Sequence, residues 1–404
     1  MNQDFFINNR KKLRSLFMGT APIVFTANVV LQQNSDNTYP FRQDSSFWYF
    51  TGINLPGLVL VIDRESEYLI MPKRSAFSEV ADGVVDDQTL AQISGIDNIY
   101  DQVLGWKKLT SRLKKVRHAA ILPSLNVINE KLDFYPNPAR EILINKIKLT
   151  NSDIKLLDIS EHVIQMRVIK QDLEIKAITK AVEITTDTIK IIKKNLNKYN
   201  YEYEIEATVL SEFRKRNSLP AYSSIVAGGI NACTLHYNRN DSLIKPKNLI
   251  LIDIGASVDN YAADITRTIL PSNDLSKRQR QVLGSVVEVQ KFAASLLRPG
   301  VELRKYESEV EIFMGEQLRS LGLIASVTTE NVRKYYPHST SHFLGLDPHD
   351  CGNYSLPVEQ NMVLTIEPGI YIPEEGIGVR IEDDFIIKNQ GVHKISHNLP
   401  PILN

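Results

Sequence analysis

Residues 248–270 read NLILIDIGASVDNYAADITRTIL and predict a β-hairpin with an acidic residue in each strand. The first strand, rich in Ile and Leu, contains Asp253, and the second contains Asp264. Turn residues lie between them. A ladder centred between Val258 and Asp259 would place the two carboxylates directly opposite each other on one face, with Cβ atoms about 4.5–5.5 Å apart.

Two like charges this close in an apolar sheet repel each other, and each also bears a desolvation cost. A bound cation would remove the repulsion. A protonated carboxyl, a nearby Arg or Lys, or a different register that separates the pair would remove it as well. The hairpin by itself leaves these alternatives open.

A second hairpin of the same kind lies near the C-terminus. VLTIEPGIY (363–371) and GVRIEDDF (378–385) predict strands on either side of PEEG (373–376). A ladder centred in that turn would place Glu367 opposite Glu382. Four acidic residues on two facing hairpins need counter-charge if all of them are to ionise.

The composition narrows the class of protein. The chain has 404 residues, 43% of them hydrophobic, which suffices for one to three domains with proper cores. Lys plus Arg and Asp plus Glu number 47 each, so no overall field attracts nucleic acid or an anionic membrane. The two cysteines, Cys233 and Cys351, form no disulfide framework and are interpreted as small buried residues. Because the N-terminus also lacks a signal-peptide core, we expect a cytoplasmic protein that binds neither nucleic acid nor membrane.

Two domains are predicted. Residues 1–168 alternate strand-like runs with helical ones, which is typical of an α/β domain, and the aromatic-dense stretch FRQDSSFWYFTG (41–52) predicts buried core. From Asp172 onward the pattern changes to two helices followed by strands. The same order then repeats, with helices at 276–298 and 304–321. We therefore expect residues 169–404 to form a domain of two α-α-β half-units, although no repeat is visible in the residues themselves.

Four histidines accompany the acidic residues. His236 precedes the first hairpin, and His338, His342 and His349 lie between the two hairpins. A lone histidine is more often a satisfied polar residue than a ligand, but this clustering beside carboxylate pairs indicates a site. The spacing matches no HExxH helix, and the chain contains no P-loop or GxSxG elbow.

Seven short motifs follow one another along the second domain. They are LHY at 235–237, Asp253, ADITRT at 263–268, HSTSH at 338–342, GLDPHD at 345–350, IEPG at 366–369 and GVRIEDD at 378–384. This ordered set resembles the metal-dependent aminopeptidase P and prolidase family, whose catalytic domain has a pita-bread fold. The stretch 41–52 resembles the N-terminal domain of aminopeptidase P.

The resemblance implies a metal centre. It predicts two divalent ions, Mn²⁺ being the most suitable for oxygen-rich coordination with one imidazole. It also implies peptide substrates that begin Xaa-Pro, and a homodimer or homotetramer. Carried over by position, the metal ligands would be Asp253, Asp264, His342, Glu367 and Glu382.

The resemblance implies further roles for residues around the metals. A metal-bridged hydroxide would attack the carbonyl that precedes proline. His236 and His349 would hydrogen-bond that carbonyl or the oxyanion, and Glu367 would carry the proton to the proline nitrogen. His236 would also contact substrate, and His338 and Arg380 would line the proline side.

Three functions compete. An Xaa-Pro aminopeptidase removes the first residue from peptides with proline second, whereas a prolidase accepts only dipeptides, and the shared motifs do not separate the two. The stretch 41–52 and the chain length favour the aminopeptidase. A non-catalytic pita-bread binding protein would lack the metal ligands, and all five are present here.

Overall fold

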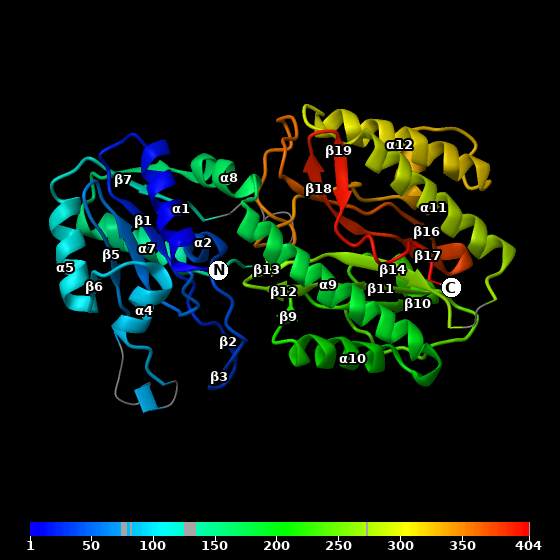
Figure 1. The fold of residues 1–404 in the computed structure, drawn as a ribbon, viewed down its shortest axis with the longest axis horizontal. Coiled ribbons are helices and arrows are strands. Elements are labelled where there is room, and N and C mark those ends of the chain that lie inside the picture. Colours follow the sequence, from blue (N-terminus) through cyan, green and yellow to red (C-terminus); the bar gives the residue numbers. More distant parts are fainter. Residues whose placement is uncertain (74–78, 81–82, 125–134, 272–273, 404) are drawn as a thin grey trace. The chain divides into compact units, whose positions relative to one another are not determined.

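The structure, a computed structural model, describes residues 1–73, 79–80, 83–124, 135–271 and 274–403 (Figure 1). It divides into two compact units, Met1–Met166 and Arg167–Asn404. No helix in the described ranges is long and apolar enough to cross a membrane.

The first unit is built on a six-stranded mixed sheet with the strand order β6-β5-β4-β1-β7-β8. The central strands are buried on both faces, as their continuous apolar sequences require. The strands of the six-stranded sheet are β1 (Ile23–Thr26), β4 (Val59–Ile62), β5 (Glu67–Ile70), β6 (Ile99–Tyr100), β7 (His118–Ile121) and β8 (Lys155–Asp158). A separate two-stranded sheet contains β2 (Gln32–Asn34) and β3 (Asn37–Thr38). The helices of this unit are α1 (Gln3–Leu16), α2 (Ser45–Thr51), α4 (Asp87–Ser94), α5 (Gln102–Leu113) and α7 (Ala139–Thr150).

The aromatic stretch 41–52 is buried over its helical part, as predicted. Residues 45–51 form α2, whose N-cap is Asp44, with the side chain accepting a hydrogen bond from the Phe47 amide. The helix ends at Gly52, which adopts a left-handed conformation with φ of 71°. From Ser46 to Thr51 every residue of this helix is buried, so this part of the stretch is core.

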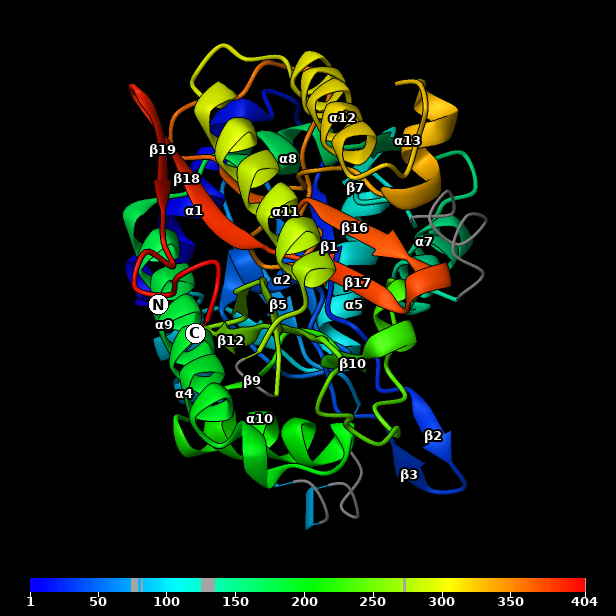
Figure 2. The same ribbon diagram turned by 90° about the vertical axis from the view of Figure 1, so that its right-hand side faces the viewer.

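The second unit repeats one order of elements, two long helices followed by strands, which confirms the two half-units. Figures 1 and 2 show the four long helices outside the strands. Helix α8 (Ser160–Val168) spans the boundary between the two units in the chain. The first half of the second unit contains α9 (Asp172–Lys194), α10 (Glu202–Lys215), β9 (Leu219–Pro220), β10 (Ile225–Gly228), β11 (Ile250–Ile254), β12 (Ala256–Val258), β13 (Tyr261–Ala262) and β14 (Ile265–Ile269). The second contains α11 (Lys277–Leu296), α12 (Leu303–Ser320), α13 (Thr329–Tyr335), β15 (Val363–Ile366), β16 (Gly369–Ile372), β17 (Ile377–Arg380), β18 (Asp383–Lys388) and β19 (Gly391–Lys394).

The first hairpin forms, but its predicted register is wrong. Asp253 pairs with Thr266 rather than with Asp264. The turn consists of Asp259 and Asn260, whose φ angles of 47° and 62° suit a two-residue hairpin turn, so the centre lies one residue later than predicted. The observed partner of Asp253, Thr266, lies two residues beyond the predicted partner, Asp264. Because side chains alternate between the two faces of a strand, Asp264 still lies on the same face as Asp253, as its diagonal neighbour.

The predicted register of the second hairpin is confirmed. Ile366 pairs with Asp383 on one side of the acidic pair, and Gly369 pairs with Arg380 on the other. The same register therefore continues through Glu367 and Glu382, which lie between the paired segments.

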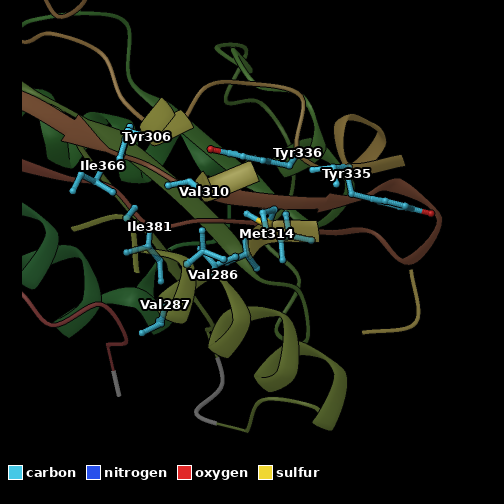
Figure 3. Close-up of a cluster of buried hydrophobic side chains, with 14 of the residues drawn as sticks. Val286, Val287, Tyr306, Val310, Met314, Tyr335, Tyr336, Ile366 and Ile381 are labelled. Carbon is cyan, nitrogen blue, oxygen red and sulfur yellow. The ribbon is translucent and has the colours of Figure 1, made fainter. Parts of the chain in front are cut away.

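A large apolar core of this unit lies between α11, α12 and the second hairpin (Figure 3). Ile366 and Ile381 belong to it, packed with residues such as Val286 and Met314. Successive side chains of a strand point to opposite faces. Burying these two isoleucines therefore directs the adjacent Glu367 and Glu382 away from the core, toward the first hairpin.

Candidate metal centre and active site

The second unit contains a cavity of 690 Å³ that collects all the site residues predicted from the sequence. The acidic residues come from the two hairpins and the histidines from the segments that connect the strands. The lining includes His236, Asp253, Asp264, His338, His342, His349, Glu367, Arg380 and Glu382.

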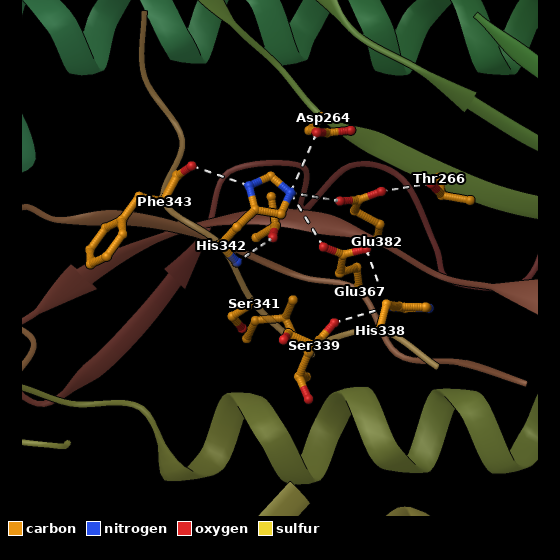
Figure 4. A network of polar contacts seen from close by, with 12 residues as sticks. Asp264, Thr266, His338, Ser339, Ser341, His342, Phe343, Glu367 and Glu382 are labelled. Carbon is orange, nitrogen blue, oxygen red and sulfur yellow. Dashed lines mark hydrogen bonds and ion pairs between the residues drawn. The ribbon is translucent and has the colours of Figure 1, made fainter. Parts of the chain in front are cut away.

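One group of polar atoms in the cavity surrounds the His342 imidazole (Figure 4). Its Nε2 lies 3.3 Å from Glu367 Oε1, 3.7 Å from Asp264 Oδ2 and 3.8 Å from Glu382 Oε1. One donor atom each from Asp264, His342 and Glu382 lie within 4.8 Å of one another. Three carboxylates and one imidazole thus point at the same small volume.

The backbone fixes which ring nitrogen of His342 faces that volume. Nδ1 is 3.1 Å from the carbonyl oxygen of Phe343, so Nδ1 carries the proton. The His342 backbone amide donates to Thr365 Oγ1 at 3.1 Å, which ties the backbone of His342 to β15. Nε2 is left as a neutral acceptor, the form in which imidazole binds metals.

Asp253 sits at the edge of this group with a cation beside it. Its Oδ2 accepts a hydrogen bond from Arg380 Nη2 at 2.5 Å. The Tyr222 hydroxyl lies 2.6 Å from Asp253 Oδ1 and 2.6 Å from Asp264 Oδ1, and its single proton can serve only one of them at a time. A nearby arginine, one of the alternatives that the sequence left open, is therefore present, but it contacts only one of the four carboxylates at hydrogen-bond distance.

The remaining acidic residues are short of positive charge. Burial and the neighbouring carboxylates raise the pKa of Glu382 to about 8, and they raise the pKa values of Asp264 and Glu367 well above the ordinary range. Burial, with His349 nearby, lowers the pKa of His342 to about 3, so this ring is neutral. Oxygen donors that need counter-charge, together with one neutral imidazole, fit a divalent cation.

The other histidines surround this group. His338 Nε2 lies 2.8 Å from the Tyr371 hydroxyl, which also accepts a hydrogen bond from Arg380 Nη1 at 3.0 Å. The His349 ring stacks on His342 with centroids 4.1 Å apart and planes at 9°. His236 is exposed to the cavity.

The two cysteines differ slightly from the prediction. Cys233 and Cys351 are partly rather than fully buried. Burial raises the pKa of each thiol to about 11, so neither is a thiolate at neutral pH. This protonation agrees with the interpretation that neither acts as a nucleophile.

Comparison with known proteins places this site in a family. The model of metallopeptidase family M24 matches residues 176–389, just over half of the chain. The chain belongs to this family. A second model, of the aminopeptidase P N-terminal domain, matches residues 6–121.

Individual proteins similar to this chain match almost its entire length. An Xaa-Pro aminopeptidase of Haemophilus influenzae is 31% identical, over 96% of this chain and 92% of its own length. An Xaa-Pro aminopeptidase of Escherichia coli is also 31% identical, over 96% and 93%. The structure of E. coli aminopeptidase P with the inhibitor Pro-Leu has a TM-score of 0.88 at 28% identity, covering 99% of this chain and 96% of that one.

Proposed function

We propose that the protein is an Xaa-Pro aminopeptidase, which removes the N-terminal residue from peptides with proline in the second position. The observation that carries the proposal is the set of three carboxylates and one imidazole that converge inside a cavity of 690 Å³. Its chemistry is that of a metallopeptidase, and near-full-length relatives named Xaa-Pro aminopeptidase supply the specificity.

Asp253, Asp264, His342, Glu367 and Glu382 are the proposed ligands of two divalent ions, for which Mn²⁺ suits the oxygen-rich donor set. When bound, such ions polarise a carbonyl and make a water molecule acidic enough to supply hydroxide near neutral pH. The raised pKa values of three of these carboxyls support the assignment, because a cation would supply the missing counter-charge.

The side chains around the ligands would orient the peptide. His236 and His349 are exposed on the cavity wall, where they would hydrogen-bond the scissile carbonyl as negative charge develops on its oxygen. His338 would line the pocket for the proline ring, held by Tyr371. Arg380 would stand behind this pocket, since its guanidinium already binds Asp253 and Tyr371.

Glu367 is the proposed proton carrier. One of its carboxylate oxygens is 3.3 Å from His342 Nε2, and the other is 3.7 Å from His338 Nδ1. It therefore lies between the proposed ligand group and the proposed proline pocket. An Xaa-Pro bond is a tertiary amide, so its nitrogen must receive a proton before proline can leave.

Peptide length separates this proposal from prolidase. A panel of matched Xaa-Pro dipeptides and Xaa-Pro-Yaa tripeptides would be incubated with Mn²⁺-loaded protein, and the products identified by mass spectrometry. We expect free Xaa and intact Pro-Yaa from the tripeptides. Cleavage of dipeptides alone would favour prolidase, and cleavage of neither, with metal bound, would favour a non-catalytic binding protein. The cytoplasmic location and the homodimer or homotetramer stay predictions from the sequence and the family resemblance.

A further inference from the structure

A buried ion cluster lies directly behind the loop that carries His349. Asp350 is 7% exposed, and its two oxygens bind two different cations. Oδ1 accepts a hydrogen bond from Arg167 Nη2 at 2.5 Å, and Oδ2 accepts one from Lys170 Nζ at 3.1 Å. Arg167 and Lys170 are 5% and 1% exposed. Among the described residues that line the cavity, neither cation appears.

Burying these charges is costly, and a buried ion cluster is weak grounds for stability, since well-packed apolar residues often do as well. Burial alone would raise the pKa of Asp350, but Arg167 and Lys170 lower it below its ordinary value, so the carboxylate is charged. What the cluster does provide is orientation. Two fixed cations, one at each oxygen, define the plane of the carboxylate.

The backbone transmits that orientation to the neighbouring residues. The Asp350 amide donates to the carbonyl of Phe343 at 2.8 Å, which closes the loop between them. Gly345 lies against the carboxylate so closely that a Cβ there would be 2.0 Å from Asp350 Oδ2. Its carbonyl in turn accepts a hydrogen bond from the Ala262 amide at 2.8 Å, which joins the loop to β13. The loop is therefore clamped where Phe343 meets Asp350 and again at Gly345.

His349 immediately precedes Asp350 in this clamped loop. Its ring lies parallel to His342, with centroids 4.1 Å apart. Because His342 is itself fixed by Phe343 and Thr365, the stack places the His349 imidazole at one defined position on the cavity wall. A shift of Asp350 would move His349 with it.

We propose that Arg167 and Lys170 are positioning residues that act through Asp350 to hold the His349 imidazole against His342. The inference rests on the proposed function, in which His349 hydrogen-bonds the scissile carbonyl. It gives a role to a segment, residues 166–170 (MRVIK), that contains none of the residues assigned to the site.

A double-mutant cycle tests this route. The four proteins are the wild type, Lys170→Met, His349→Ala and the double variant, assayed on an Xaa-Pro-Yaa tripeptide. A misplacement of about 1 Å can cost about 10²-fold in rate, and because Arg167 still holds one oxygen we expect Lys170→Met to lower kcat about tenfold with unchanged metal content. In the His349→Ala background, Lys170→Met should cause no further loss. An equal loss in both backgrounds would show that Lys170 acts independently of His349 and would overturn the proposal.

Lys305→Met is the matched control. Lys305 pairs with Glu302 at 2.8 Å on the surface of the same unit, with its side chain 71% exposed, so its loss should leave kcat unchanged. If Lys170→Met does not fold, Lys170→Gln enters the same cycle. Thermal unfolding and metal analysis of each variant separate a folding defect from loss of position.

A crystallographic arm decides the proposal independently of activity. In crystals of Lys170→Met, the His349 ring should leave its parallel stack on His342. An unchanged stack at 4.1 Å would contradict the proposal. Wild-type protein that binds metal but cleaves no Xaa-Pro peptide would instead refute the proposed function, so the two failures are distinguishable.

Discussion

Replacing Arg267 by methionine should strongly destabilise the catalytic unit. The Arg267 side chain is fully buried and joins both hairpins to the C-terminal segment. Methionine can fill much of the volume but donates no hydrogen bond. The acceptors that would lose a donor are Thr266 O at 2.8 Å, Glu382 O at 2.7 Å, Asp383 Oδ1 at 2.6 Å, Pro400 O at 2.9 Å and Leu399 O at 3.1 Å.

The magnitude follows from what remains around Asp383. Lys394 Nζ stays 2.6 Å from Asp383 Oδ2, and Gln290 still donates to the same oxygen at 2.9 Å, so the carboxylate keeps a counter-charge. Removing one partner of a buried ion pair costs about 3–5 kcal/mol, and the surviving lysine favours the lower end of that range. Each buried carbonyl left without a donor adds about 1–3 kcal/mol unless water reaches it. With even one such carbonyl left dry, we expect a loss of at least about 4 kcal/mol, which lowers the Tm of a unit of this size by at least about 8 °C.

Differential scanning calorimetry of metal-free wild type, Arg267→Met and Arg280→Met provides the assay. Arg280 is the control, because its side chain is 62% exposed and 4.0 Å from Asp274. An exposed pair of this kind contributes about 0–1 kcal/mol, so the control transition should barely move. If Arg267→Met and Arg280→Met had the same Tm, the structural role assigned to the buried guanidinium would be refuted.

Three further predictions concern the metal centre. Because the pKa of Glu382 is raised to about 8, the metal-free folded protein keeps a proton that the unfolded chain releases near pH 4.5. The stability of the metal-free protein should thus fall as pH rises from about 4.5 to 8. The gain in Tm on adding Mn²⁺ should be larger at pH 8 than at pH 6, and an equal gain at both would contradict the assignment of Glu382 as a metal ligand. Asp264→Asn should abolish metal-dependent turnover yet leave a folded protein by circular dichroism, and near-wild-type turnover at saturating Mn²⁺ would exclude Asp264 as a ligand. His342→Ala should lower metal occupancy, measured by elemental analysis, whereas His349→Ala should keep the metal and lose about 10²–10³ in kcat; equal metal loss in both would remove the distinction.

The two hairpins show how far register can be predicted from sequence. In the second hairpin, PEEG ends in Gly376, whose φ of 61° marks the end of the turn, and the predicted register is correct. In the first hairpin no glycine marks the turn. Asp259 and Asn260 both take positive φ, which Asp and Asn tolerate, and the predicted centre missed them by one residue. The prediction that Asp253 and Asp264 share one face is nevertheless correct, because the partner is displaced by two residues and side chains alternate with a period of two.

The residues that sequence reasoning missed are those whose partners lie far along the chain. Tyr222 belongs to no motif, and its contact with Asp264 spans 42 residues. Arg380 was assigned to substrate binding, but the partner it holds in the structure, Asp253, lies 127 residues away. Spacing predicts neighbours within a hairpin or helix, whereas such contacts depend on how segments far apart in the chain pack together, within one half-unit for Tyr222 and between the two for Arg380. The ligand set itself came from the family resemblance, since paired carboxylates on a hairpin are equally compatible with a protonated carboxyl or a neighbouring Arg or Lys.

The most direct test of the account is a metal titration followed by product analysis. Metal-stripped protein would be titrated with Mn²⁺ while bound metal and the release of Xaa from Xaa-Pro-Yaa are measured on the same samples. Activity should be absent without metal and should rise to a plateau at two ions per chain, with Pro-Yaa as the second product. Full activity in the stripped protein, or a protein that binds two ions and releases no Xaa, would contradict the central claim.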